Sequence, residues 1–209
     1  DDTGEFSLTP EQAAVFARES EPTCIQGLVQ GVVGQFVKED VAVDVFKTGR
    51  GRPWGEHHEC CFCGTERFFR PAYAGHLLDE WIPAMDGVAD KLTAGAKVAD
   101  IGCGLGTSSM LMAEQYPNSI IHAYDFHGPS IEEAKRRAQE KGLTNLEFYV
   151  SDAGSIPQES YDLACIFDAW HDMGDPVGIA KAIKDTLADD GTFMVVEPMA
   201  LDGLQNNIE

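Results

Sequence analysis

The feature that most constrains this chain is a short apolar run that breaks into alternating glycines. Residues 98–101 predict a buried strand, glycines follow at Gly102, Gly104 and Gly106, and a helical apolar pattern begins at Met110. Glycine is needed in such a turn where the backbone takes positive φ angles or a ligand approaches it closely. The stretch therefore predicts a strand, a tight turn and a helix start, arranged as a cradle for a nucleotide cofactor.

The next predicted strand, residues 118–124, ends in an acidic residue. Asp125 follows about 20 residues after the glycines, where a carboxylate can accept hydrogen bonds from both hydroxyls of a ribose. Glycine-rich turns also occur as plain connections between strands and helices, and the glycines alone leave both interpretations open. Asp125 favours the cofactor site.

The spacing of the glycines separates two classes of cofactor. A dinucleotide site expects Gly-x-Gly-x-x-Gly, in which the third glycine lets the helix pack closely on the strand. Thr107 stands at the position of that third glycine. Asp100, at the tip of the first strand, would repel a diphosphate and attract an ammonium group. Both residues favour a nucleoside that carries an amino acid.

The run Val-Ala-Asp-Ile-Gly-Cys-Gly-Leu-Gly-Thr at 98–107 resembles the first motif of the class I S-adenosylmethionine-dependent methyltransferases. The resemblance extends over about residues 94–198. The segments 65–73 and 171–176 resemble bacterial members that carry an N-terminal winged-helix region, which are similar to small-molecule O-methyltransferases. The resemblance implies S-adenosylmethionine as cofactor, S-adenosylhomocysteine as product and a small-molecule acceptor, with a hydroxyl as the expected acceptor group.

Strands and helices alternate along the rest of the chain. Further strands are predicted at 146–150, 161–167 and 192–197, and helices at 110–115, 130–140 and 176–187. This alternation predicts an α/β fold with a doubly wound, mainly parallel sheet. The resembled sheet has two more strands that form an antiparallel hairpin. Because the residues after 198 are too few and too polar to supply them, we expect a truncated methyltransferase domain over residues 75–209.

Residues 1–74 predict an N-terminal helical segment. Thr9, Pro10 and Gln12 form an N-cap, a first-turn proline and a capping-box partner. Helices are expected at 9–19, 24–37 and 41–46, and a long helix at 74–92. The winged-helix resemblance implies that residues 1–8 are the remnant of a larger accessory module, and the helices are a candidate homodimer interface.

Candidate cofactor contacts lie where the predicted strands end, because ligands of such sheets bind beyond the carboxyl ends of the strands. The candidate residues at or after the ends of the first four predicted strands are Asp100, Gly102, Cys103, Gly104, Gly106, Thr107, Asp125, Phe126, His127, Asp152, Ala153 and Asp168. The resemblance implies that Asp152 faces the adenine amino group, whereas a turn-capping role for it is equally consistent with the sequence.

An aromatic stretch before the predicted long helix supplies two more candidates. Phe69 or Tyr73 could touch the cofactor or the substrate, because the face of an aromatic ring attracts a cation such as the sulfonium. In the resembled enzymes this segment closes over the cofactor. Packing of these rings against the core is the alternative.

A hydroxyl acceptor must lose its proton during methyl transfer, and His171 is the candidate base. It follows the fourth strand, and an imidazole titrates near neutral pH. Its position matches the base of the resembled O-methyltransferases. A histidine that caps or packs its loop is the alternative.

Charge and composition exclude several classes of partner. The chain has 35 acidic and 15 basic residues, a formal net charge of −20, so nucleic acid and anionic membranes would be repelled. It contains no apolar run long enough to span a membrane, and its first residues resemble no signal segment. We expect a soluble, cytoplasmic protein that acts on small molecules.

The six cysteines predict reduced thiols rather than a disulfide framework. Cys60, Cys61 and Cys63 lie next to His57 and His58, and the Cys-x-x-Cys spacing would suit zinc. A structural zinc site would need a second ligand pair, and none is evident. We therefore expect an ordinary loop with free thiols and no metal.

Two other functions remain open from the sequence. A cofactor-binding regulatory or partner protein without turnover would explain the missing strands. An NAD-dependent oxidoreductase would use the same kind of turn, but Thr107 argues against it.

Overall fold

The computed structural model describes residues 4–208 and divides into two compact units, which meet in sequence between Ala84 and Met85. Residues 1–3 and 209, at the ends of the two predicted segments, lie outside the described residues. The predicted domain boundary between residues 74 and 75 stays a prediction. None of the described helices is both long and apolar enough to cross a membrane.

The second unit is built on a sheet of five parallel strands in the order β3-β2-β1-β4-β5. The strands are β1 (Lys97–Ile101), β2 (Ile120–Asp125), β3 (Leu146–Val150), β4 (Tyr161–Phe167) and β5 (Leu187–Val196). The strand order reverses at β1, which lies between β2 and β4. The predicted doubly wound fold is confirmed, and its switch point lies where the glycine turn begins.

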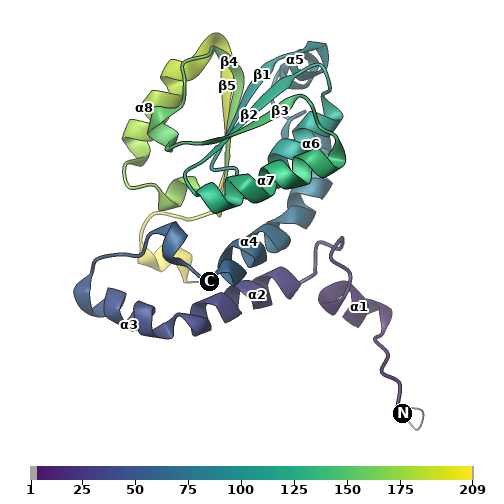
Figure 1. Ribbon diagram of the computed structural model, residues 1–209, viewed down its shortest axis with the longest axis vertical. Coiled ribbons are helices and arrows are strands. Elements are labelled where there is room, and N and C mark those ends of the chain that lie inside the picture. The colour runs from purple at the N-terminus through teal and green to yellow at the C-terminus, as the bar shows by residue number, and fades with distance from the viewer. Residues whose placement is uncertain (1–3, 209) are drawn as a thin grey trace. The chain divides into compact units, whose positions relative to one another are not determined.

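Helices cover both faces of this sheet (Figure 1). They are α5 (Val88–Ala94), α6 (Thr107–Gln115), α7 (Gly128–Lys141) and α8 (Pro176–Thr186). Ala99 and Ile101 of β1 pack in one core cluster with Ile183 of α8. Phe148 lies on the opposite face, where a Cβ on Gly106, just before α6, would meet both its ring and the Ala134 side chain of α7. This two-sided cover explains why the central strands β1, β2 and β4 consist mainly of buried apolar residues.

Strand β5 begins earlier than the predicted 192–197. Tyr161 pairs with Leu187 and Leu163 with Thr192, so residues 188–191 form an irregularity inside a longer strand. The described residues after β5 contain one short 3-10 helix, η5 (Leu204–Asn207), and no strand.

The first unit is helical, as predicted. It contains α1 (Pro10–Phe16), α2 (Gln26–Val37), α3 (Glu39–Thr48), the 3-10 turn η1 (Trp54–Glu56), α4 (Glu59–Ala72) and the π-helix η2 (Tyr73–Trp81). The capping box at Thr9 is confirmed, because its hydroxyl accepts from the Gln12 amide at 3.3 Å while the Gln12 side chain accepts from the Thr9 amide at 3.0 Å.

Helices α2 and α4 approach so closely that only glycine fits between them. A Cβ atom on Gly27 would lie 2.4 Å from the Phe68 nitrogen, and one on Gly64 would lie 2.4 Å from the Gly31 nitrogen. Backbone contact of this kind fixes the crossing of the two helices. It also leaves the apolar side chains of α2 exposed on its other face, at Leu28, Val29, Val32, Val33, Phe36 and Val37.

Two predictions for this region were wrong. The cysteine-containing stretch is not a loop, because α4 begins at Glu59 and His58 caps it by accepting from the Cys60 amide at 3.2 Å. The long helix over 74–92 does not form as one element. The helix η2 ends at Trp81, and α5 starts only after Gly87, which adopts φ +72°. A proline at position 83 lacks the amide that a continuous helix would need.

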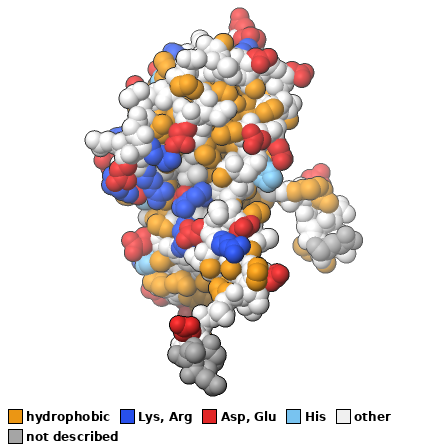
Figure 2. Space-filling model, turned by 90° about the vertical axis from the view of Figure 1, so that its right-hand side faces the viewer, with side chains coloured by type: hydrophobic (Ala, Val, Ile, Leu, Met, Phe, Trp, Pro, Cys, Tyr) orange, Lys and Arg blue, Asp and Glu red, His pale blue; other side chains and the backbone are white. Residues whose placement is uncertain are grey.

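On the face seen in Figure 2, the acidic excess does not gather in one place. Figure 2 shows acidic side chains spread over the face in view, with basic and apolar side chains between them. The six cysteines are free thiols.

Candidate active site

The three glycines after β1 all adopt positive φ angles, +74° at Gly102, +53° at Gly104 and +76° at Gly106, but for different reasons. A Cβ on Gly102 would lie 2.9 Å from Ala169, and one on Gly106 would lie 2.7 Å from the Phe148 ring. A Cβ on Gly104 would meet no atom within 4 Å. Packing therefore requires two of the glycines, whereas Gly104 borders open space.

Asp125, at the end of β2, ties this turn to the strand. One carboxylate oxygen accepts from the Gly104 amide at 2.9 Å and the other from the His127 amide at 2.8 Å. The side chain is buried, and burial raises its pKa. Each carboxylate oxygen can accept a second hydrogen bond, so Asp125 retains acceptor capacity for a diol.

Asp100 is wholly buried beneath the start of α6. One of its oxygens, Oδ2, accepts from the hydroxyls of Ser108 at 2.7 Å and Ser109 at 2.6 Å. The other, Oδ1, has no hydrogen-bond partner among the described residues. Burial raises the pKa of Asp100 to about 6. Buried polar atoms are normally paired, so Oδ1 is a free acceptor that a bound donor could satisfy.

The remaining candidates near β1 and β2 differ in exposure. Cys103 is buried, which raises its pKa, and its amide donates to the Tyr124 carbonyl at 3.0 Å. Thr107 is the first residue of α6. Phe126 is exposed, and His127 is half-buried with Nδ1 2.7 Å from the Ser130 hydroxyl.

Asp152 lies at the end of β3 and caps the 3-10 helix η3 (Ala153–Ser155). Its carboxylate accepts from the Gly154 amide at 2.8 Å, and the residue is exposed. The structure thus bears out the capping role. The adenine contact of Asp152 and Ala153 stays a prediction.

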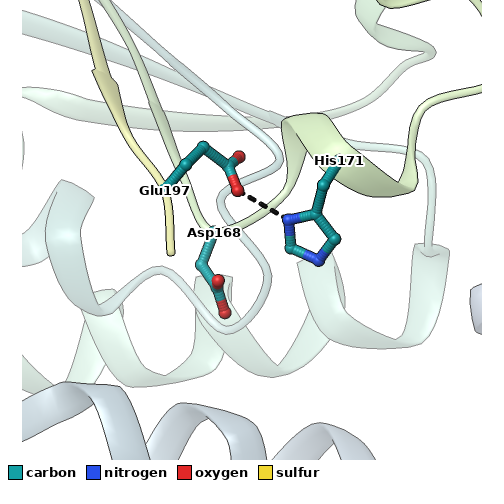
Figure 3. Close-up of side chains that lie close together, drawn as sticks. All are labelled: Asp168, His171 and Glu197. Atoms are coloured by element: carbon teal, nitrogen blue, oxygen red, sulfur yellow. Dashed lines mark hydrogen bonds and ion pairs between the residues drawn. The ribbon is translucent and has the colours of Figure 1, made fainter. Parts of the chain in front are cut away.

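Asp168, His171 and Glu197 come together at the ends of β4 and β5 (Figure 3). Asp168 directly follows β4, and Glu197 directly follows β5. His171 lies in the 3-10 turn η4 (Trp170–Asp172), and its Nδ1 is 2.6 Å from a Glu197 oxygen.

Glu197 determines which nitrogen of His171 is free. Its other oxygen accepts from the backbone amides of Ala169 at 3.1 Å and Trp170 at 2.6 Å. An ionised carboxylate only accepts hydrogen bonds, so His171 Nδ1 carries the hydrogen in this pair. In the neutral ring Nε2 is then the acceptor. The bond to Glu197 also raises the pKa of His171, which makes the ring a stronger base.

Asp168 is held in an unusual backbone conformation. Its φ is +51°, in the left-handed region that non-glycine residues seldom adopt. Burial raises the pKa of its carboxylate to about 6. Asp168, His171 and Glu197 each offer one ligand atom, and these three atoms lie within 4.8 Å of one another. The group could hold a metal ion as well as a proton.

Phe69 and Tyr73 belong to the N-terminal unit, in α4 and η2. Their rings stack with centroids 6.2 Å apart and an interplanar angle of 17°. Both residues are half-buried within that unit. Their expected contact with the cofactor stays a prediction.

Comparison with known proteins agrees with the glycine turn and the parallel sheet. The family model described as "Methyltransferase domain" matches residues 92–209, more than half of the chain. The chain belongs to this methyltransferase family. The resemblance of the first motif and the fold class are thereby confirmed.

Individual relatives act on different acceptors, to judge by their names. The chain is 32% identical over 108 residues to aklanonic acid methyltransferase DauC of Streptomyces sp. (strain C5). The matched region covers 50% of this chain and 49% of that protein. It is 30% identical over 172 residues to sterol 24-C-methyltransferase ERG6A of Gibberella zeae, which covers 80% of this chain and 42% of that protein. The chain thus spans about half the length of these relatives.

A solved structure shows the same fold. The YcgJ protein from Bacillus subtilis matches with a TM-score of 0.53 and 27% identity, over 60% of this chain and 52% of that one.

Three residues of the site were not predicted. Glu197 was taken only as the last residue of the predicted strand 192–197, and no role was expected for Ser108 and Ser109, whose hydroxyls bond to Asp100. The signal for Glu197 was its position, because an acidic residue directly after a parallel strand lies at the ligand-binding edge.

Proposed function

We propose that the chain binds S-adenosylmethionine at the turn between β1 and α6 and transfers its methyl group to a hydroxyl of a small molecule. The observation that carries this proposal is the open space at Gly104, whose amide donates to Asp125, at the switch point of the sheet in a chain of the methyltransferase family. His171 and Glu197 lie at the ends of the neighbouring strands of the same sheet.

The residues of the turn fit this cofactor. Gly104 leaves room for a ligand against the backbone, and Asp125 has acceptor capacity for the ribose hydroxyls. The unpaired Oδ1 of Asp100 suits a cationic donor such as the ammonium group. When bound, S-adenosylmethionine supplies an electrophilic methyl group.

His171 is the proposed general base. Its Nδ1 hydrogen is held by Glu197, so Nε2 can accept the proton of the acceptor hydroxyl. Glu197 is a positioning residue, because it fixes the ring through one oxygen while its other oxygen is anchored by two backbone amides. The imidazolium that forms is stabilised by the same carboxylate.

Two variants test this assignment. His171→Ala should lower methyl transfer by about 10²–10⁴-fold while S-adenosylhomocysteine affinity stays nearly unchanged. Glu197→Gln should lower turnover less, because an amide oxygen can still accept from His171. Transfer of a labelled methyl group to a panel of phenols, hydroxyquinones and alcohols is the measurement. Full activity in His171→Ala would refute the base role and favour an acceptor that needs no deprotonation.

We also infer that Phe69 or Tyr73 contributes an aromatic face to the bound cofactor or acceptor, supported by their stacked, partly accessible rings. At least one of the variants Phe69→Leu and Tyr73→Leu should then weaken S-adenosylhomocysteine binding or raise the KM of the acceptor. Unchanged values in both variants would leave these rings a structural role.

We further propose a homodimer through the N-terminal helices. The exposed apolar face of α2, which includes Val29, Val33 and Phe36, supports it, because contiguous apolar surface of this kind is typical of protein interfaces. Analytical ultracentrifugation should show a dimer that Val33→Asp dissociates. A monomeric wild-type chain would contradict it.

A further inference from the structure

The side chains of Asp168, His171 and Glu197 offer more than a base and its positioning partner. We propose that they form a binding site for one divalent transition-metal ion, held by two carboxylates and one imidazole. The three ligand atoms lie within 4.8 Å of one another at the ends of β4 and β5 (Figure 3).

The distances suit such an ion after small side-chain rotations. Neighbouring ligands bonded to one ion at about 2.0–2.2 Å lie about 2.8–3.6 Å apart in octahedral or tetrahedral coordination. His171 Nδ1 and the Glu197 oxygen are already 2.6 Å apart. His171 is exposed and the two carboxylates are half-buried, so the side chains have room to open around an ion and solvent can reach it.

The sheet fixes the two carboxylates relative to each other. Phe167 and Val196 are paired in the register of β4 and β5, and the Asp168 amide donates to the Val196 carbonyl at 2.8 Å. Asp168 and Glu197 therefore leave adjacent strands at the same level. Ligands that project from rigid, hydrogen-bonded backbone make a site with little conformational cost of assembly.

Among the three ligands, the Asp168 carboxylate is the one without a hydrogen-bond partner among the described residues. It is half-buried, and none of the hydrogen bonds found among residues 4–208 involves its oxygens. Asp172 adds a further carboxylate, 3.7 Å from His171 Nε2. Three carboxylates around one imidazole leave a net negative site, which a divalent cation would neutralise.

The donor set indicates the class of ion. Two carboxylate oxygens and an imidazole nitrogen, with no thiolate, suit Mn²⁺, Fe²⁺ or Zn²⁺ better than a soft ion. An ion bound to Nδ1 takes the place of the hydrogen shared with Glu197, and the ring hydrogen then resides on Nε2. A neutral imidazole has only one acceptor nitrogen, so the bound ion blocks His171 as a base. This consequence, inhibition of turnover, rests on the proposed function, whereas ion binding does not.

The test is a titration of the full chain with Mn²⁺, in which binding is measured as the loss of the free-ion signal in electron paramagnetic resonance. We expect one saturable ion per chain that Zn²⁺ displaces. Asp168→Asn and Glu197→Gln should each weaken binding about tenfold or more, because each replaces an anionic ligand by a neutral one. Asn is among the residues that best tolerate a positive φ, and Glu197→Gln provides a second, independent variant.

Asp172→Asn is the matched control, because it removes a nearby charge from outside the group of three ligands. Its loss of Mn²⁺ affinity should be clearly smaller than that of Asp168→Asn or Glu197→Gln, because it weakens the negative charge of the site without removing a ligand. No saturable ion in the wild type, or equal affinity in Asp168→Asn and the wild type, would overturn the proposal. Calorimetric titration with S-adenosylhomocysteine on the same samples reports the proposed function separately, so that either result can fail while the other holds.

Discussion

Replacement of Gly104 by alanine separates the space that a ligand needs from the conformation that the turn needs. Gly104 adopts φ +53°, and a Cβ there meets no protein atom within 4 Å. The left-handed conformation costs an alanine about 1–2 kcal/mol relative to glycine. Gly142, at the end of α7, has φ +69° and the same lack of neighbours. Gly104→Ala and Gly142→Ala should therefore lower the free energy of unfolding by similar amounts.

Ligand binding should separate the two variants. If the nucleoside lies against Gly104, the added methyl group displaces it, and S-adenosylhomocysteine affinity should fall at least about tenfold, or 1.4 kcal/mol. Gly142→Ala should bind as the wild type does. Calorimetric titration and urea unfolding of both variants are the measurements. Equal affinity in the two variants would refute the placement of the ligand, whatever the change in stability.

Three further predictions concern the supporting contacts. Asp125→Ala should cost about 1.5–3 kcal/mol of cofactor binding for each hydrogen bond lost; a calorimetric loss below about 0.5 kcal/mol would leave Asp125 a structural role. The pKa of Asp100 is about 6 in the folded state against 3.8 for a free side chain, so the folded state binds this proton more tightly than the unfolded state. The free energy of unfolding of the wild type should therefore fall by roughly 3 kcal/mol as the pH rises from 3.8 to 6. Asp100→Asn should lack this fall in urea unfolding, and an identical pH dependence would contradict burial as its cause. Gly64→Ala should destabilise the N-terminal unit by about 1–3 kcal/mol, because its Cβ would meet Gly31; an unchanged thermal transition would contradict the close approach.

The sheet could be predicted because its signals are local. Strands β3 and β4 were predicted with their observed bounds, since each is a short run enriched in apolar residues and bounded by polar ones. The glycine turn was equally visible. Its positive φ angles follow from the residue type, but only the structure shows that Phe148 requires Gly106 while Gly104 faces open space.

Helix α4 was missed because its stability comes from a distant partner. Its sequence contains Gly64, Pro71 and three cysteines, which are weak helix formers or breakers. Packing of its glycine against α2 overrides these local preferences. No pattern within residues 59–72 reveals that contact, because it depends on Gly27 and Gly31.

The base could be predicted and its partner could not. His171 was chosen from its position after the fourth strand, but Glu197 lies 26 residues further along the chain. Their contact depends on the pairing of β4 with β5, which a single sequence does not specify. The left-handed conformation of Asp168 was likewise not predicted, since no pattern in the sequence indicates φ +51° at a non-glycine residue.

A crystal structure of the chain with S-adenosylhomocysteine tests the central claim most directly. The account predicts nucleoside density against Gly104, with both ribose hydroxyls within hydrogen-bond distance of the Asp125 carboxylate. Density for the ligand at any other place, with Asp125 still bonded only to the amides of Gly104 and His127, would contradict it.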